Sequence, residues 1–297
     1  MLIKRSVIDR IGVLDERFSP GMCEDTDYCF RMTEAGYKLM ICTNVFVHHF
    51  GSTSFGEMPE RMRELLYQNR LIFQKKWGFH PVYSGGVRGE LISLMNERDA
   101  GGNIHVLDVG CACGGTLLEI KNQFKKAELY GIERNPNSAV IASQFSNVRI
   151  GDIETNDQLL NYPFEFFDYI ILGNVLEQLK DPAFVLNKLK QILKPTGKII
   201  ASVFNGMHYS VVFNLLNGNW TYKDSGILDR ENLRIFTLRE LETIFNQADF
   251  KNIIIQTQDL PPKNKDKQWL ELLTQLTVSK EIKPFEVYQY LITAEKD

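Results

Sequence analysis

The sequence predicts an α/β protein built on a mostly parallel sheet that helices cover on both faces. From about residue 90 onward, short apolar segments alternate with helix-like segments, which is typical of parallel strands joined by crossover helices. The apolar run 106–109 also passes through a turn of small residues into a helix-like segment. A strand, a tight turn and a helix start in this order indicate a cradle for a nucleotide-like cofactor. The first 80 residues predict a second, smaller α/β unit.

The composition excludes several classes of protein. At 297 residues, with 44% apolar and 24% charged residues, the chain suits one large globular domain or two modest ones. The 34 basic and 37 acidic residues give a net charge of -3, so we expect no nucleic-acid partner. No apolar run approaches the roughly 20 residues of a membrane span. Lys4 and Arg5 precede no apolar signal core, so no secretory signal is expected.

The cysteines support a reducing compartment. They are scattered, odd in number and without a CxxC pair: Cys23, Cys29, Cys42, Cys111 and Cys113. This pattern argues against a disulfide framework and against a zinc site. We therefore predict a cytoplasmic protein without a bound metal.

The smaller unit at the front of the chain is predicted to contain both strands and helices. In order these are a strand at 2–3, a helix at 6–11, a helix at 25–35, a strand at 38–48 and an amphipathic helix at 57–77. Asp25 is the expected cap of the second helix and Gly36 its stop. A Gly85-Gly86 pair predicts a linker over 81–89, so the expected domains are 1–80 and 90–297.

Three acids at a helix start, Glu24, Asp25 and Asp27, have two interpretations. They are favourable charges at the positive end of the helix dipole, or they carry chemistry. The motifs LIKRSVIDRIGVLDERF, GMCEDTDYCFRMTEAGYKL and VFVHHFGSTS together resemble the acceptor-side half of inverting GT-A glycosyltransferases. The resemblance implies that the Glu24-Asp25 segment carries a general base and that His48 or His49 helps to hold a metal.

The same resemblance implies a missing part. It covers roughly residues 1–56, and the donor-binding half of that fold, with its acidic metal motif, would precede Met1. We therefore expect a truncated remnant without glycosyltransferase activity. Sugar-nucleotide turnover by this polypeptide would contradict that expectation.

The larger unit is predicted to alternate strands and helices to its end. The expected strands are 104–109, 128–132, 148–150, 169–172, 198–203, 253–257 and 287–294. The expected helices are 90–97, 116–124, 138–144, 183–193 and 238–247. Because the carboxyl ends of parallel strands share one edge of a sheet, we expect the residues that follow them to form one site.

Each residue of that site has a physical rationale. Gly110 lets the chain turn and its backbone approach the cofactor. Glu133 ends the second strand, 23 residues after Gly110, where a carboxylate can accept hydrogen bonds from both ribose hydroxyls. Asp152 suits the adenine amine, with Ile153 packing on the ring. Asn174 follows the fourth strand, near the expected reacting end of the cofactor.

A nicotinamide-dependent Rossmann enzyme is the competing interpretation, because it uses the same strand, turn and acid. The loop GCACGG does not match GxGxxG, the pattern of those enzymes. Its Gly110 and Gly114 match the methyltransferase pattern GxGxG with one change. Over about 86–297, the domain resembles class I S-adenosylmethionine (SAM) methyltransferases of bacterial sugar and polysaccharide pathways. The matching motifs are VLDVGCACGG, YGIERNP, GDIE, FDYIILGNVLEQLKDP, LKPTGKIIASVFN, NGMHYSVVFNLLNGNWTYKDSGILDRENLRIFT and FEVYQYLITAEK.

The resemblance implies a Rossmann-like fold with a mostly parallel seven-stranded sheet whose last strand is antiparallel. It also implies SAM as cofactor and S-adenosylhomocysteine as product. The implied cofactor-binding residues are Asp108, Gly110, Cys111, Ala112, Gly114, Glu133, Arg134, Asp152, Ile153, Asn174 and Val175.

Three positions depart from the family pattern. Ala112 stands where the middle glycine is usual, and we expect it to be tolerated with a negative φ. Gln178 and Asn232 each replace a common histidine, which weakens any catalytic role inferred from those positions.

His208 is the candidate catalytic base, because it follows the fifth strand and a neutral imidazole accepts a proton. The alternative is a histidine bonded to backbone in a lid. Candidate acceptor-binding residues are Tyr209, Trp220, Tyr222, Asp229, Arg230 and Arg234. Aromatic packing and surface ion pairs explain these residues nearly as well. Cys111 and Cys113 are interpreted as small loop fillers.

The predicted function is therefore SAM-dependent O-methylation of a sugar, nucleotide-sugar or glycan hydroxyl in polysaccharide biosynthesis. The acceptor class rests on the resemblance and on the fused front segment. A methyltransferase for non-sugar small molecules or proteins and a non-enzymatic glycan-binding or scaffold protein remain as alternatives. Assembly into a homodimer stays open.

Overall fold

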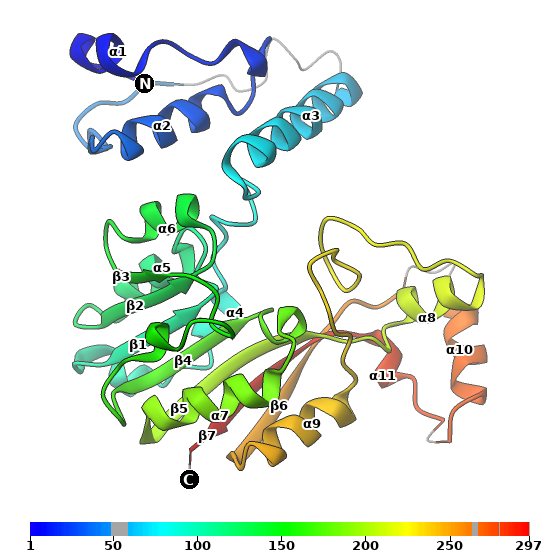
Figure 1. The fold of residues 1–297 in the computed structure, drawn as a ribbon. Coiled ribbons are helices and arrows are strands. Elements are labelled where there is room, and N and C mark those ends of the chain that lie inside the picture. The colour runs from blue at the N-terminus through cyan, green and yellow to red at the C-terminus, as the bar shows by residue number, and fades with distance from the viewer. Residues whose placement is uncertain (49–58, 263–266, 279, 297) are drawn as a thin grey trace.

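A seven-stranded sheet organises the larger part of the chain (Figure 1). The structure is a computed structural model and describes residues 1–48, 59–262, 267–278 and 280–296. The strands lie in the order β3-β2-β1-β4-β5-β7-β6. Their bounds are β1 (His105–Val109), β2 (Glu128–Glu133), β3 (Asn147–Ile150), β4 (Phe167–Gly173), β5 (Leu193–Phe204), β6 (Lys251–Asp259) and β7 (Val287–Glu295).

The direction of the strands confirms the predicted Rossmann-like architecture. Neighbouring strands from β3 across to β5 pair in parallel, and β7 runs antiparallel to both β5 and β6. The central strand β4 reads FDYIILG, a nearly continuous apolar run, because a parallel strand in the middle of a sheet is buried on both faces.

Helices cover both faces of the sheet, as expected. On one face, the helices α4 (Gly89–Ile92), α5 (Gly115–Gln123) and α6 (Pro136–Ala142) share a core with β1 and β4. On the other face lie α7 (Pro182–Ile192) and α9 (Leu238–Gln247). Adjacent residues of β1 serve the two layers, because strand side chains alternate: Val106 packs in the first core and Leu107 in the second.

Some element bounds differ from the prediction. The expected helix at 90–97 is a single turn, α4, and the fifth strand begins earlier than expected and runs for 12 residues. Three helices were not predicted: α8 (Tyr209–Leu216), α10 (Lys267–Gln275) and α11 (Lys283–Glu286). Across the ranges described, no helix combines the length and apolarity that a membrane crossing requires.

The front unit is helical. It contains α1 (Arg5–Ile11), α2 (Glu24–Glu34) and α3 (Pro59–Trp77), which lie above the sheet in Figure 1. The cap of α2 differs from the prediction, because Cys23 occupies the N-cap in a left-handed conformation and Asp25 lies within the first turn. Gly36, with φ 82°, follows the helix as expected.

The predicted strands at 2–3 and 38–48 are wrong, because neither segment forms a ladder with another described segment. Residues 38–48 nevertheless keep the apolar character on which the prediction rested. Met40, Ile41 and Phe46 are 87%, 90% and 88% exposed. A strand pattern needs a neighbouring strand to supply its hydrogen bonds, and within the described residues this segment has none.

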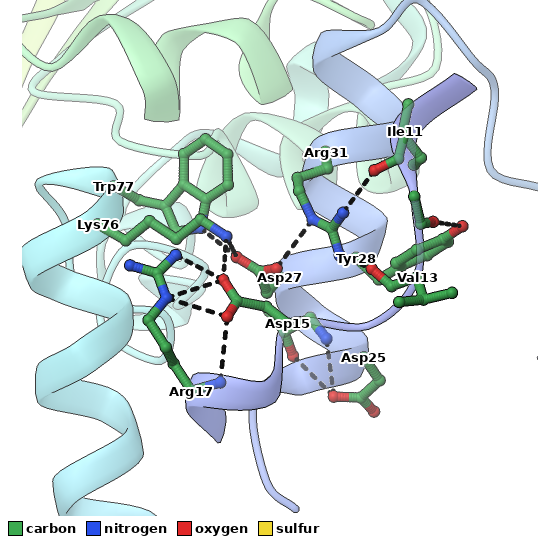
Figure 2. A network of polar contacts seen from close by, with 12 residues as sticks. Ile11, Val13, Asp15, Arg17, Asp25, Asp27, Tyr28, Arg31, Lys76 and Trp77 are labelled. Carbon is green, nitrogen blue, oxygen red and sulfur yellow. Dashed lines mark hydrogen bonds and ion pairs between the residues drawn. The ribbon is translucent and has the colours of Figure 1, made fainter. Parts of the chain in front are cut away.

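A buried carboxylate joins α2 to α3 (Figure 2). Asp27 is fully buried and pairs with Arg31 at 3.0 Å and with Lys76 at 2.6 Å. The Trp77 indole donates to the same carboxylate at 2.9 Å. Lys76 also bonds to Asp15 at 2.8 Å, so a single lysine ties the end of α3 to two segments of the front unit.

We expect Asp27→Asn to destabilise the front unit by about 3 kcal/mol, because it removes the charge that compensates two largely buried cations. Native-state hydrogen exchange of the α2 and α3 amides measures the change. Asp25→Asn is the matched control, since Asp25 is exposed and its side chain, among the described residues, bonds to its neighbour Thr26 alone. Equal exchange in the two variants would contradict the assignment of Asp27 as the joint between the helices.

Candidate functional site

The predicted site residues meet at one edge of the sheet. Gly110 follows β1, Glu133 ends β2, Asp152 follows β3 and Asn174 follows β4. Because these four strands are parallel and pair in register, their carboxyl ends open on the same side. The topology thus gathers residues separated by more than 60 positions in the chain.

The loop after β1 is shaped for close approach of its backbone. Gly110 and Gly114 have φ angles of 73° and 77°, in the left-handed region. A Cβ at Gly110 would lie 2.9 Å from Val175 Cγ2, and one at Gly114 would lie 2.8 Å from a Phe145 ring carbon. Side chains are therefore excluded at both positions, and the loop fits the cradle that a nucleotide-like cofactor requires.

Ala112 departs from its predicted conformation. Its φ is +49°, so the expectation of a negative φ is wrong. An alanine in this region costs about 1 kcal/mol, since its Cβ crowds its own backbone. The Ala112 amide donates to Glu133 Oε2 at 2.8 Å, and this bond holds the loop in the strained conformation.

Glu133 is held rigidly at the end of β2. While Oε2 accepts from Ala112, Oε1 accepts from the Asn135 amide at 2.7 Å, and the residue is 9% exposed. Each oxygen keeps a second lone pair for a ligand. The carboxylate is therefore oriented in advance for two hydroxyl donors, as the ribose assignment requires.

The predicted linker forms one wall of the loop. The Cys113 amide donates to the Ser84 carbonyl at 2.9 Å, and a Cβ at Gly115 would lie 2.5 Å from the Gly85 carbonyl oxygen. The Arg88 amide donates to Thr116 Oγ1 at 3.1 Å. The segment 81–89 therefore packs against the start of α5 and does not act as a free connection.

Arg88 is a site residue that the sequence analysis missed. Its guanidinium donates to Asn174 Oδ1, and its charge opposes the pKa increases of Asp108 and Glu177. Arg88 therefore lies near the carboxyl ends of β1 and β4, close to the carboxyl groups of Asp108 and Glu177. A basic residue two positions after the Gly85-Gly86 turn was the only available signal.

Two buried carboxyl groups flank this arginine. Burial raises the pKa of Asp108 to about 7. The charge of Arg88 acts in the opposite direction and lowers this pKa, while the charge of Glu133 raises it further. Burial likewise raises the pKa of Glu177 to about 7, although the hydrogen bonds from the Phe204 amide and from Asn174 lower it. Both groups therefore titrate near neutral pH.

Glu177 was not predicted either. The side chain is 1% exposed, and its Oε1 accepts from the Phe204 amide at 2.7 Å and from Asn174 Nδ2 at 3.3 Å. Its Oε2 is buried without a hydrogen-bond partner among the residues described. Such an atom is costly unless it is protonated or meets a ligand. The position three residues after Asn174, in the same turn, was the signal.

The remaining cofactor candidates lie at the same edge with contacts of their own. Asp152 accepts from the Glu154 amide at 2.8 Å, and Ile153 is 6% exposed in the core beside β1. Arg134 pairs with Glu231 at 2.7 Å. Val175 packs beside Gly110.

The loop cysteines fill space. Cys111 Sγ would lie 2.6 Å from a Cβ on Gly131, which shows how closely it packs on β2. Burial raises the pKa of both loop thiols, that of Cys113 to about 12. Neither thiol is a thiolate at neutral pH, in keeping with their interpretation as fillers.

His208 has no ring nitrogen open to an acceptor. The residue is 1% exposed, its Nδ1 lies 2.8 Å from Ser210 Oγ and its Nε2 lies 3.1 Å from the Leu260 carbonyl. Burial lowers its pKa and keeps it neutral. This geometry matches the backbone-bonded alternative, because the ring caps α8 and joins it to the end of β6. A catalytic role for His208 stays a prediction that requires these bonds to break.

Four of the six acceptor candidates contact other described residues, and the other two are partly exposed aromatic residues. The ring centroids of Tyr209 and His208 lie 4.4 Å apart with their planes tilted by 46°, while Trp220 and Tyr222 are 41% and 45% exposed. The polar candidates make the following contacts: Asp229 accepts from the Glu231 amide at 2.9 Å, Arg230 pairs with Asp224 at 3.0 Å, and Arg234 donates to the Leu179 carbonyl at 3.1 Å. Their roles in binding an acceptor stay predictions.

Within the described part of the front unit, the candidate residues form no cluster of metal ligands. Asp25 and His48 are exposed, while one carboxylate oxygen of Glu24 is buried without a hydrogen-bond partner among the described residues. His49 lies outside the described residues. Of the residues described, no three or more His, Cys, Asp or Glu side chains cluster as metal ligands would.

Comparison with known proteins gives a matching family. Residues 83–254, more than half of the chain, match the family model described as "Methyltransferase domain". The chain is 31% identical over 112 residues to a sterol 4-C-methyltransferase of Caenorhabditis elegans, covering 36% of this chain and 33% of that protein. It is 28% identical over 123 residues to a ubiquinone biosynthesis O-methyltransferase of Cereibacter sphaeroides, covering 40% and 49%. The chain thus spans between about a third and a half of these curated relatives.

The comparison with solved structures gives the following alignments. A SAM-dependent methyltransferase from Archaeoglobus fulgidus aligns with a TM-score of 0.49 and 16% identity over 76% of this chain and 98% of that one. A phosphoethanolamine N-methyltransferase from Haemonchus contortus, solved with SAM, aligns with a TM-score of 0.47 and 15% identity over 70% and 52%.

Proposed function

Because this chain belongs to the methyltransferase-domain family and thus carries a SAM-dependent methyltransferase domain, we propose that it methylates a hydroxyl group of a sugar, nucleotide sugar or glycan. The observation that carries the cofactor assignment is the convergence of Gly110, Glu133 and Asn174 at one edge of the sheet. The product besides the methylated acceptor is S-adenosylhomocysteine.

The proposed division of labour follows the strand ends. The glycine loop approaches the cofactor with its backbone, Glu133 accepts from the ribose hydroxyls, and Asp152 with Ile153 holds the adenine. SAM supplies an electrophilic methyl group on a sulfonium. The protein has to align the acceptor oxygen for in-line displacement and to exclude water. Asn174 and Val175, after β4, line the side from which the acceptor approaches.

The acceptor class has support separate from that of the cofactor. It is supported by the resemblance of the domain to sugar-pathway methyltransferases and by the front segment that precedes it. We propose that Glu24, Asp25 and His48 belong to a remnant of the acceptor-side half of a glycosyltransferase. Aromatic side chains of the front unit form a cluster against which Cys113 and Ile141 pack: Phe18, Phe30, Phe73, Trp77 and Phe79. This contact between the front unit and the cofactor loop supports a joint role.

A non-sugar acceptor is the second candidate. The matched relatives are named for sterols, phosphoethanolamine and ubiquinone biosynthesis, so small molecules of other classes need testing. The third candidate, a non-enzymatic glycan-binding or scaffold protein, requires that the loop no longer holds the cofactor.

The test uses the full chain with methyl-labelled SAM and a panel of acceptors. The panel contains monosaccharides, nucleotide sugars, oligosaccharides, phosphoethanolamine, a catechol and a peptide. We expect label in a sugar hydroxyl and none in a Glu133→Ala variant. Label only in a non-sugar acceptor would overturn the acceptor class. Absence of SAM binding in calorimetry at sub-millimolar concentration would overturn the enzymatic assignment.

A further inference from the structure

Segments from three parts of the chain meet at Glu177. It lies in the turn Leu176–Gln178, which follows β4. Its carbonyl oxygen accepts from the amides of Leu233 and Arg234 at 2.8 and 3.0 Å. Its Oε1 accepts from the amide of Phe204, the last residue of β5, at 2.7 Å. Leu233 and Arg234 lie between α8 and α9, in the stretch that contains most of the acceptor candidates, so Glu177 joins that stretch to the ends of two strands.

The side chain of Asn174 extends this contact to Arg88. Its Nδ2 donates to Glu177 Oε1 at 3.3 Å, and its Oδ1 accepts from the Arg88 guanidinium. A side-chain amide carries its oxygen on one side and its NH2 group on the other. Because Glu177 offers an acceptor to the NH2 group, the Asn174 oxygen is turned toward Arg88. The Asn174 backbone is held as well, since its amide donates to the Ser202 carbonyl at 3.0 Å.

The Arg88 guanidinium lies at the end of β4 and keeps N–H groups for a ligand. Its Nε would lie 3.4 Å from a Cβ on Gly173, the last residue of that strand. The side chain is 40% exposed, and within the described residues the guanidinium makes its hydrogen bond to Asn174 alone. Glu90 lies 3.9 Å from Nη1, beyond hydrogen-bond length. An arginine presents several donors in one plane, so Arg88 can still receive a carboxylate or a phosphate.

Glu177 also determines the charge beside Arg88. Its Oε2 is buried and has no hydrogen-bond partner among the residues described. With a proton on Oε2 the side chain is neutral, and Oε1 keeps its bonds from Phe204 and Asn174. Burial raises the pKa of Glu177 to about 7 and the charge of Arg88 lowers it, so both forms are present near neutral pH and the two groups interact.

Further charged side chains surround this pair. They are Asp108 on β1, Arg134 after β2, and Glu231 and Arg234 before α9. Arg134 pairs with Glu231 at 2.7 Å, and the Arg234 guanidinium donates to the Leu179 carbonyl at 3.1 Å. Asp108 is buried, and the charge of Arg88 lowers its pKa too. Arg88 thus serves two buried carboxyl groups, and ionisation of either reduces the positive charge that it offers to a ligand.

We propose that Glu177 is a positioning residue that, through Asn174, holds the Arg88 guanidinium in place for an anionic group of a ligand bound at this edge of the sheet. The group is a carboxylate or a phosphate, and it belongs to the cofactor or to the acceptor. The neutral form of Glu177 supports this binding, because it keeps the bond from Asn174 without adding a negative charge beside Arg88. The ionised form weakens it. The inference rests on the cofactor edge of the proposed function and not on the acceptor class.

The test is titration calorimetry of the full chain with S-adenosylhomocysteine, which carries a carboxylate, and with methylthioadenosine, which lacks it. Uridine diphosphate, added to the protein saturated with S-adenosylhomocysteine, probes an anionic group on the acceptor side. We expect Arg88→Gln to weaken the binding of S-adenosylhomocysteine or of uridine diphosphate about tenfold. The affinity for methylthioadenosine should stay unchanged, since this ligand offers Arg88 no anion.

Variants of Glu177 separate positioning from general support of the fold. Glu177→Met removes the acceptor that orients Asn174 and should weaken the same ligand about tenfold. In an Arg88→Gln background it should have no further effect, because the guanidinium that it positions is absent. Glu177→Gln keeps an oxygen for Asn174 and should restore wild-type affinity at pH 6. Between pH 6 and 8 the wild type should lose affinity about fivefold and Glu177→Gln less, because its remaining loss comes from Asp108.

Asp168→Asn is the matched structural control. Asp168 accepts from the His105 amide and from Lys194, each at 2.8 Å, near the start of β4. This variant disturbs the same strand at its other end and should leave the affinity for S-adenosylhomocysteine unchanged.

The outcomes distinguish the inference from the proposed function. Unchanged affinity of Arg88→Gln for both anionic ligands would overturn the inference. So would a loss caused by Glu177→Met that is equally large with and without the Arg88 guanidinium, because a purely structural role is additive. A wild type that binds no S-adenosylhomocysteine would overturn the cofactor assignment of the proposed function as well.

Discussion

Replacing Glu133 by alanine is expected to weaken SAM binding by about 100-fold. The variant would lose two charge-assisted hydrogen bonds between the Glu133 carboxylate and the ribose, each contributing on the order of 1.5 kcal/mol. It would also lose the bonds from the amides of Ala112 and Asn135, which donate to this carboxylate at 2.8 and 2.7 Å. The loop would then no longer be held in the conformation that places Ala112 at φ +49°. Titration calorimetry with SAM measures the change.

Two controls separate the ribose contact from a general loss of structure. Glu133→Gln keeps one acceptor oxygen and presents an N–H where the loop needs an acceptor, so we expect an intermediate loss of about tenfold. Glu128→Ala removes an exposed carboxylate at the other end of the same strand and should leave SAM affinity unchanged. Unchanged affinity in Glu133→Ala would contradict the assignment of Glu133 to the ribose.

The second large effect concerns stability and pH. The pKa of Glu177 is raised from 4.5 to about 7 in the folded chain. The folded state therefore binds the proton more tightly than the unfolded state does between these values. The contribution of Glu177 protonation to the stability of the fold is therefore fully present below pH 4.5 and is lost as the pH rises through about 7. The loss amounts to about 3 kcal/mol, and Asp108 adds a loss of the same sign.

Glu177→Gln should flatten this dependence. Glutamine keeps an oxygen for the Phe204 amide but cannot ionise, so urea unfolding at pH 5, 6, 7 and 8 should show a smaller decline than wild type. Part of the slope should remain because Asp108 still titrates. Glu242→Gln, at an exposed position of α9, should reproduce the wild-type curve. A Glu177→Gln curve as steep as the wild type would mean that this carboxyl does not titrate as the structure implies.

The sequence predicted most of the sheet and the residues that follow its parallel strands, where the proposed cofactor site lies. Strands of a parallel sheet are apolar along their length, and their carboxyl ends share one edge by topology, so residues after each strand can be grouped without coordinates. Gly110 and Glu133 belong to this class. Arg88 and Glu177 do not belong to it. A local sequence pattern does not predict that an arginine of the linker will lie near the ends of two strands, nor that the carboxyl group of Glu177 will be buried beside it.

The two wrong predictions, on segment 38–48 and on Ala112, and the untested one on His208 concern properties that depend on distant parts of the chain. The segment 38–48 has the composition of a strand, but strand formation depends on a partner that composition cannot report. His208 has the position of a base, but its availability depends on Leu260, which is 52 residues away. The prediction of a negative φ at Ala112 considered only the conformational preference of alanine, whereas a hydrogen bond to Glu133 stabilises the positive φ.

The sequence by itself determined the fold family, the seven strands of the sheet in their chain order, and the residues that follow the parallel strands. These properties are local, because hydrophobic periodicity and turn residues act over a few positions. Only the tertiary structure decided which side chains are buried, which polar atoms are already satisfied and which apolar faces remain in water. Those properties arise between segments distant in the chain. The loop 110–114 shows both: its sequence predicts a cofactor cradle, and its geometry is set by Glu133 and the segment that carries Arg88.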